Sequence, residues 1–282
     1  MIRPDDWFIH VDMLDKRLFD TRGLHTTSSA LNPCDMTTDD VDYEMSTGKH
    51  PHILEIHGMN QESLEHFVTH YGMEYEYLSL FHCQLISDLS PLADLPKLKG
   101  VDINWNIRTD RLWDMSHNSH LTYLGIMDCK KITQGLNLLQ TGRSLEELSV
   151  CGSIFTAYPM DSLFCMGNLP NLRHLHAMFI KPAIKETSFL DTLPALQEFN
   201  FEAGLFTTEE IAYLCAKYPN LGGTYMGPYG PDHPGTNTYM RVSGYRKPTL
   251  EIPRQQAALD RHVAKFNALV EKYREELCSQ DG

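Results

Sequence analysis

The chain has 282 residues, of which 42% are hydrophobic and 22% are charged, and its formal net charge is −13 at pH 7. These values are typical of a folded protein, and the acidic balance argues against nucleic-acid binding, which relies on a basic surface. No apolar run approaches the ~18 residues that a membrane-spanning helix needs, and the first residues have no apolar segment of the kind found in a secretory signal peptide.

Residues 1–50 do not follow the pattern of the rest of the chain, and we expect them to form an N-terminal cap. Residues 7–11 alternate apolar and polar side chains, which predicts a strand. Residues 32–51 are polar and acidic, which predicts a loop. A calcium loop is a second interpretation of these carboxylates, but their spacing is not that of an EF-hand.

A repeated apolar pattern runs from residue 51 to residue 229. Its unit is Leu-x-x-Leu-x-Leu, with Ile or Val as alternatives, and the copy through Leu121, Leu124 and Ile126 is one example. Several copies open on Leu-Pro-x-Leu, as at Leu95-Pro96. Eight copies occur in phase, 23 to 27 residues apart, and they begin at residues 51, 75, 98, 121, 145, 172, 196 and 221. Self-similarity at this period predicts a solenoid of stacked repeats.

This pattern resembles the leucine-rich repeat family, and the unit from Cys83 to Ile103 resembles the internalin type found in bacteria. Cys83 occupies the Asn or Cys position of that family, and the apolar positions follow at Ile86, Leu89, Leu92, Leu95 and Leu98. The resemblance implies an α/β fold. A curved parallel β-sheet would line the concave side, short α- and 3₁₀-helices would line the convex side, and a cap would close each end.

The residues themselves support the same interpretation. Side chains alternate along a strand, so Leu124 is expected to point into a core that neighbouring repeats share. Asn106, Cys83 and Cys129 stand where the chain leaves a strand. An inward Asn can bond the backbone groups that the turn leaves open, and a buried Cys is a small apolar substitute for it.

Short helices are expected between some of the strands. Residues 60–72 and 207–219 both predict one, and the second has a capping box formed by Thr207 and Glu210. Residues 89–96 contain too many breaks for more than one helical turn.

The repeat ends at residue 229, and residues 230–282 are expected to form a C-terminal cap. Residues 239–252 predict a short strand pair. Residues 254–278 predict the longest helix, with one apolar stripe made of Leu259, Val263, Phe266, Val270, Tyr273 and Leu277. We expect this stripe to cover the open end of the repeat core; the alternative is a dimer formed through the helix.

The 14 histidines raise the question of a metal site. His66 and His70 lie four residues apart on a predicted helix, and His174 and His176 share one face of a predicted strand. Each pair is only half of a zinc site, and the H-E-x-x-H pattern is absent. We also find no nucleophile motif and no phosphate-binding loop. The sequence therefore predicts no catalytic residue, no metal and no cofactor.

The concave face is the candidate binding site. If the repeats are in phase, it carries seven aromatic and Met residues, Tyr77, Phe81, Trp105, Tyr123, Met127, Met178 and Phe179, together with Asp102 and Asp128. Such side chains are enriched at protein interfaces. The alternative is that they are ordinary surface aromatics.

The sequence thus predicts a non-catalytic module that binds a protein partner on its concave face. One specific version is an immunity or inhibitor protein that masks a basic toxin or enzyme, although an acidic surface also serves solubility alone. A metal-dependent hydrolase is the alternative from another class. Seven unpaired-looking cysteines favour a reducing compartment, so we expect a cytoplasmic monomer that contacts neither nucleic acid nor membrane.

Overall fold

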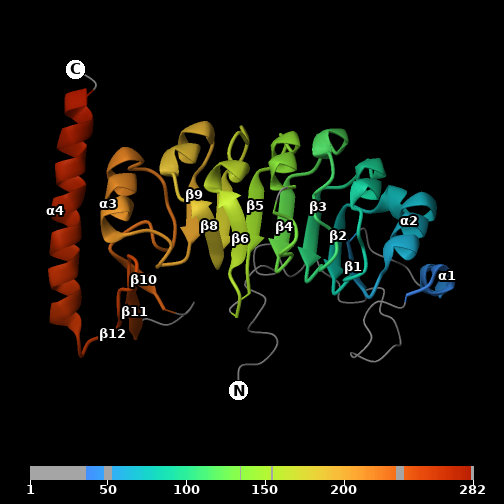
Figure 1. Cartoon of the computed structure of the whole chain (residues 1–282), viewed down its shortest axis with the longest axis horizontal. Coiled ribbons are helices and arrows are strands. Elements are labelled where there is room, and N and C mark those ends of the chain that lie inside the picture. The colour runs from blue at the N-terminus through green and yellow to red at the C-terminus, as the bar shows by residue number, and fades with distance from the viewer. Residues whose placement is uncertain (1–35, 48–52, 134, 154, 233–237, 281–282) are drawn as a thin grey trace.

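The computed structural model describes residues 36–47, 53–133, 135–153, 155–232 and 238–280. The strand expected at residues 7–11 lies outside the described residues. Figure 1 shows the strands of one sheet standing side by side in a row, with helices along one edge of the row and the longest helix at one end.

Helix α1 spans Thr38–Thr47, where a loop was predicted, and this prediction was wrong. The amide of Thr37 donates to the Asp40 carboxylate at 2.8 Å, and the amide of Asp40 donates to the Thr37 hydroxyl at 3.2 Å. This reciprocal pair caps the helix, much as a Ser/Thr and Glu pair does. Val41 of this helix is fully buried, and Met45 packs against the same core, so two apolar anchors and a cap offset the polar composition.

Seven parallel strands form the main sheet, and they pair in the order in which they occur in the chain. Their bounds are β1 Ile53–His57, β2 Tyr77–Phe81, β3 Gly100–Asn104, β4 Tyr123–Met127, β5 Glu147–Cys151, β7 His174–Met178 and β9 Glu198–Phe201. Each strand begins two residues after the start of a predicted unit. The structure is therefore a mixed α/β fold with a seven-stranded parallel sheet.

The strand register places equivalent residues of the repeated pattern beside one another. Leu124 on β4 pairs with Val101 on β3 and with Leu148 on β5, and Ile126 likewise pairs with Ile103 and Val150. All of these side chains are buried in one continuous apolar core. Because side chains alternate along a strand, this register turns every second residue of the sheet away from the core.

The eighth predicted unit does not form a strand. It begins at Leu221, but it contributes only an isolated bridge between Glu198 and Gly222. Gly223 follows with φ of +148°, a conformation that side chains rarely adopt, and a Cβ there would lie 2.0 Å from the carbonyl oxygen of Phe199. The chain therefore turns away from the sheet after one bridge.

The connections on the helical edge are short, as expected. The α-helices are α2 Gln61–His70 and α3 Thr208–Lys217, and the 3₁₀-helices are η2 Gly72–Glu74, η3 Ser90–Asp94, η4 Met115–His117, η5 Leu136–Thr141, η6 Leu163–Met166 and η7 Thr187–Thr192. The predicted capping box of Thr207 and Glu210 is confirmed, and Asn60 and Ser63 form a second one at α2.

The role predicted for Asn106 is also confirmed. Its amide nitrogen donates to the carbonyl oxygens of Cys83 and Ile86 at 3.0 and 2.8 Å. Its amide oxygen accepts from the backbone N–H groups of Arg108 and Thr109 at 2.9 and 2.8 Å. One buried side chain thereby satisfies four backbone groups that the turn leaves without partners.

Two further strands were not predicted. β6 Tyr158–Ser162 and β8 Ile180–Ile184 pair in parallel as a small second sheet. They follow β5 and β7 in the chain, and β6 lies in the longest of the predicted units. The hydroxyl of Tyr158, on β6, donates to the carbonyl oxygen of Ile132 and fastens this sheet to the preceding turn.

The C-terminal residues form the predicted strand pair and the predicted long helix, together with one further strand, β10. β10 Tyr229–Pro231, β11 Tyr239–Val242 and β12 Thr249–Glu251 form an antiparallel sheet, and α4 spans Gln256–Gln280. Figure 1 shows α4 alongside α3 at the end of the row, with its C-terminal turns extending beyond α3. Phe266 and Val270 of its apolar stripe join the main core. No helix in the described part of the chain is both long enough and apolar enough to cross a membrane.

Candidate binding face of the sheet

The side chains that alternate with the core residues form three rows on the opposite side of the sheet, which we call the outer face. Neighbours within a row are paired residues of adjacent strands, at the ~4.8 Å spacing of a sheet. The first row is Tyr77, Gly100, Tyr123, Glu147, His174 and Glu198; the second is Glu55, Ser79, Asp102, Gly125, Ser149, His176 and Asn200; the third is His57, Phe81, Asn104, Met127, Cys151 and Met178.

Four aromatic rings gather where β1, β2 and β3 end, and we call them the aromatic cluster: His57, Phe81, His82 and Trp105. The ring centroid of Phe81 lies 4.7 Å from that of His57, 4.5 Å from that of His82 and 5.2 Å from that of Trp105. The rings of His82 and Trp105 are 4.1 Å apart. Such contacts contribute beyond simple burial, so the cluster is a preformed aromatic surface.

A left-handed residue follows several of the strands. His82, Trp105, Asp128 and Phe179 have φ between 51° and 57°, a conformation that costs a side-chain-bearing residue roughly 1 kcal/mol. The strand ladder holds them there, because the amides of His82 and Trp105 donate to carbonyl oxygens of the next strand at 3.1 and 2.9 Å. This kink breaks the strand alternation and so places His82 and Trp105 beside Phe81.

Tyr123 and Asp102 were predicted to be exposed, but the structure buries them: only 3% and 4% of their surfaces are accessible. The physical reason is the pair of glycines beside them. A Cβ at Gly125 would lie 1.8 Å from the Asp102 carboxylate and 2.6 Å from the Tyr123 hydroxyl, and Gly100 leaves similar room for the rings of Tyr77 and Tyr123. The Tyr123 hydroxyl donates to Asp102 at 3.0 Å. Tyr123 is therefore part of the packing of the outer face and is not an accessible anchor.

Burial controls the protonation of this pair. It raises the pKa of Asp102 to about 7, a shift that the hydrogen bond from Tyr123 reduces and that the charges of Glu147 and Glu55 increase. Burial, together with Asp102 itself, also holds the pKa of Tyr123 well above its ordinary value. The centre of the outer face thus carries a carboxyl group that changes charge near neutral pH.

Beyond β4 the first row becomes polar, as the second row is along most of its length. His174 and Glu198 lie 3.3 Å apart, and Asn200 donates to Glu198 at 2.9 Å. These contacts, chiefly that of Asn200, lower the pKa of Glu198, whereas burial raises the pKa of Glu147. Burial also lowers the pKa of His176 to about 4, so this imidazole is neutral at physiological pH.

The other predicted site residues lie partly exposed. Tyr77, Phe81, Trp105, Met127, Met178, Phe179 and Asp128 are all half-buried. Beside Trp105 the surface has a hollow of about 280 Å³, lined by Gln84, Trp105, Asn106, Ile107, Asp128, Lys130 and Lys131. Asp128 pairs there with Lys130 at 2.8 Å. The structure brings Phe81 and Trp105 together, whereas Met178 and Phe179 lie three and more strands away from them.

His57 and His82 were missed in the sequence. His57 is the register partner of Phe81, and His82 stands one residue after its strand, as Trp105 does. His57 therefore occupies the same position of the repeated pattern as Phe81, and His82 the same position as Trp105. Aligning the units by position identifies both histidines, whereas selecting aromatic and Met residues by type does not.

The two histidine pairs do not gather metal ligands. His66 bonds Asp42 of α1 at 2.5 Å, and His70 contacts the carbonyl oxygen of His66 at 3.0 Å. The first contact ties α2 to α1, and the second lies within α2. Among the residues that the structure describes, no group of three or more His, Cys, Asp or Glu side chains is arranged to hold a metal ion.

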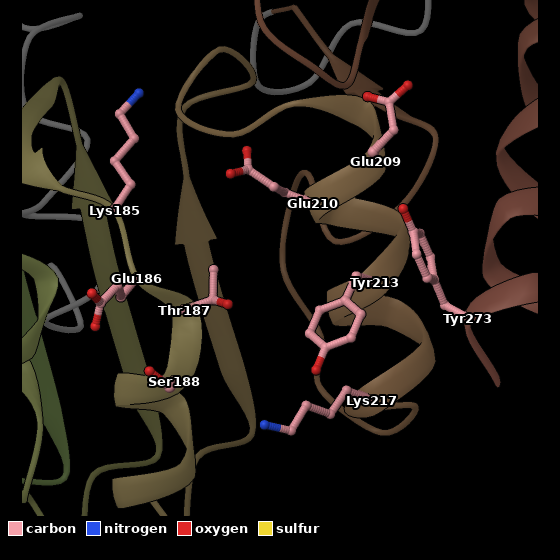
Figure 2. A pocket seen from close by; sticks show the side chains of 9 residues that line it. All are labelled: Lys185, Glu186, Thr187, Ser188, Glu209, Glu210, Tyr213, Lys217 and Tyr273. Atoms are coloured by element: carbon pink, nitrogen blue, oxygen red, sulfur yellow. The ribbon is translucent and has the colours of Figure 1, made fainter. Parts of the chain in front are cut away.

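A second groove, of about 480 Å³, lies on the helical side between the segment 185–188, α3 and α4. Figure 2 shows Lys185, Glu210, Lys217 and Tyr273 along its walls. Lys217 pairs with Asp191 at 2.7 Å, Lys185 donates to the carbonyl oxygen of Leu205, and Glu210 caps α3. Lys217, Lys185 and Glu210 thus stabilise the contacts between these elements, and the groove is the junction between the sheet and the C-terminal helices.

No protein-family model matches this chain, and no curated protein matches it.

Proposed function

We propose that this chain is a solenoid of the leucine-rich repeat type that binds a protein partner on the outer face of its sheet and catalyses no reaction itself. In this proposal the sheet lines a concave surface. The observation that carries it is the aromatic cluster, in which Phe81 and Trp105 lie preformed beside a hollow of about 280 Å³. Clustered, partly exposed aromatic side chains are the usual anchors of protein interfaces.

The setting of the cluster supports a binding role. Its residues stand on paired strands and on backbone kinks that are held by hydrogen bonds, so little conformational entropy is lost when a partner binds. The resemblance to leucine-rich repeats agrees with this, because stacked repeats commonly present an extended face to another protein.

A second version of the function is an inhibitor or immunity protein that masks a basic toxin or enzyme. The net charge of −13 favours it, and so do the carboxylates of the outer face. We further propose a monomer in the cytoplasm. The apolar stripe of α4 is used within the chain at Phe266 and Val270, and all six cysteines within the described segments are free thiols.

The test is affinity capture from the native cell with the full chain as bait. A Phe81→Ala, Trp105→Ala double variant should lose the captured protein, because truncating an interface anchor typically weakens binding about thirtyfold. A matched control is the Tyr239→Ala, Tyr245→Ala double variant, which removes two exposed aromatic side chains on or beside the C-terminal sheet and should retain the partner.

Circular dichroism and thermal melting of each variant separate loss of binding from loss of folding. Equal capture by a folded Phe81→Ala, Trp105→Ala variant and by the wild-type chain would contradict the proposal. Capture lost equally in both double variants would contradict the placement of the site at the aromatic cluster.

A further inference from the structure

Two polar atoms on the outer face are enclosed without a partner. Glu147 Oε1 on β5 and His176 Nε2 on β7 are both buried, and neither has a hydrogen-bond partner in the described ranges. The two strands are neighbours, and His176 stands two positions beyond His174, the register partner of Glu147. Buried polar atoms are nearly always hydrogen-bonded in native proteins, so this pair is expected to receive a partner from outside the sheet.

The adjacent side chains have contacts of their own. The hydroxyl of Ser149, the register partner of His176, lies 3.5 Å from Cys151 Sγ. His174 contacts Glu198 at 3.3 Å, and the other oxygen of Glu198 accepts from Asn200 at 2.9 Å. Nearby on β3, the buried Asp102 receives only the hydroxyl of Tyr123. Neither Asp102 nor Glu147 forms an ion pair with a Lys or Arg within the segments that the structure describes.

The chemistry of the two atoms selects a hydrogen-bond donor with positive charge. A carboxylate oxygen only accepts hydrogen bonds, and a neutral imidazole can present one accepting nitrogen. A carboxylate without a counter-charge in a buried setting is costly unless a cation joins it. A planar guanidinium provides two or more N–H donors in one plane and binds carboxylates in this way.

We propose that Glu147 and His176, with Asp102 nearby on β3, bind a guanidinium or ammonium group that the protein partner presents to the outer face. This inference rests on the proposed function, since it assumes that the partner contacts this face, and it makes the partner basic at that point. Phe81 ends β2, the strand before that of Asp102, and Trp105 directly follows β3, the strand of Asp102 itself, so a basic segment crossing the sheet would meet aromatic faces and then carboxylates.

Protonation of the site should couple to binding. Tyr123, Glu147 and Glu55 act on the pKa of Asp102 from the surrounding strands, and His174 and Glu198 act on that of Glu147. The buried thiols of Cys129 and Cys151 also face Asp102, and burial raises their pKa values, so they stay neutral near neutral pH. Burial leaves Asp102 partly protonated near pH 7. A bound cation favours the ionised carboxyl groups, so binding releases protons and the affinity rises between pH 6 and pH 8.

The experiment is a titration of the full chain with N-acetyl-arginine amide at pH 6 and at pH 8, in which isothermal calorimetry or NMR measures the binding. N-acetyl-citrulline amide is the control probe, because it has nearly the same shape without the charge. We expect binding of the arginine probe alone, tighter at pH 8. Glu147→Gln should weaken it at least tenfold, whereas Glu146→Gln, which removes the same charge from the exposed preceding residue, should change it less than twofold.

Equal affinities for the arginine and citrulline probes would overturn the proposal. Water would then be the partner of the two unpaired atoms. Equal effects of Glu147→Gln and Glu146→Gln would also overturn it, because they would indicate unspecific attraction to an acidic chain. The two proposals fail separately. If the Phe81→Ala, Trp105→Ala variant loses its partner but the arginine probe does not bind, the cation site is wrong and the binding face stands. If the arginine probe binds at Glu147 but the Phe81→Ala, Trp105→Ala variant keeps its partner, the cation site stands and the proposed binding role of the aromatic cluster is wrong.

Discussion

At the scale of single residues, buried polar side chains hold the turns of this protein together. Asn106 is the clearest case, because its amide group makes four hydrogen bonds to backbone atoms of two successive turns. Cys83 and Cys129 take the same place after β2 and β4, and their thiols contact carbonyl oxygens at 3.4 to 3.6 Å. A thiol makes weaker bonds than an amide, so these turns depend more on burial and the Asn106 turn depends more on hydrogen bonding.

Replacing Asn106 with Ala should therefore destabilise the protein by about 3 kcal/mol or more, because each buried backbone group left unsatisfied costs roughly 1–3 kcal/mol. Urea unfolding monitored by circular dichroism measures the change. Asn171→Ala is the matched control, since Asn171 is exposed and makes a single hydrogen bond to the carbonyl oxygen of Arg143; its effect should stay within about 0.5 kcal/mol. Similar losses in the two variants would mean that the Asn106 network contributes little.

At the scale of elements, each strand is stable only between its neighbours. Strand β4 has five residues, and its inward Leu124 and Ile126 contact the core side chains of β3 and β5. A strand of this length buries too little apolar surface to be stable alone. A change at one inward position should consequently be felt across several repeats.

Leu124→Asp tests this dependence. Leu124 is fully buried, and an unpaired buried carboxylate costs several kcal/mol against a total stability of about 5–15 kcal/mol. We expect the variant to be unfolded at 25 °C, by circular dichroism and by loss of hydrogen-exchange protection in β3, β4 and β5 together. The variant His120→Asp introduces the same residue at an exposed position just before the repeat unit and should melt as the wild-type chain does. A Leu124→Asp variant that also melts like the wild type would contradict the strand register.

At the scale of the whole molecule, the row of strands needs a cover at its end. The last strand, β9, is followed by α3 and then by α4, whose Phe266 and Val270 are buried in the main core. The rings of Tyr213 and Tyr273 meet edge to face at 5.6 Å, which adds a specific contact between the two helices. The remaining face of α4 is largely exposed and polar, as the outer face of a terminal cap should be.

Deleting residues 254–282 should expose this part of the core, and we expect the shortened chain to aggregate. Light scattering and analytical ultracentrifugation measure the outcome, and Phe266→Asp should act in the same direction as the deletion. The control is Ala268→Asp, on the exposed side of α4, which should leave the protein monomeric and folded. A shortened chain that stays folded and changes from dimer to monomer would show that α4 is a dimer contact instead of a cap.

The repeated apolar pattern was sufficient to predict the order of the seven strands of the main sheet and the side chains that they bury, but neither β6 and β8 nor the absence of a strand in the eighth unit. It carries this information because alternation along a strand is local, and because Leu124, Leu148 and Leu175 recur at a nearly constant interval. Caps were predictable for the same reason, since Thr207 and Glu210 act within one helical turn. Helix α1 was missed because its cap uses Asp40 where Glu is usual and because its apolar anchors are only the buried Val41 and the half-buried Met45.

The outer face could not be predicted to the same depth, because its exposure depends on three strands at once. Periodicity placed Tyr123 and Asp102 on this face correctly, but whether they reach the surface depends on the space that Gly100 and Gly125 leave beside them. The left-handed kinks that bring His82 and Trp105 next to Phe81 depend on backbone hydrogen bonds to the following strand. Glu147 and His176 each bury one polar atom without a partner among the described residues, while the neighbouring His174 contacts Glu198. Contacts between residues more than 20 positions apart settle each of these points, and a pattern read along the chain does not contain such distances.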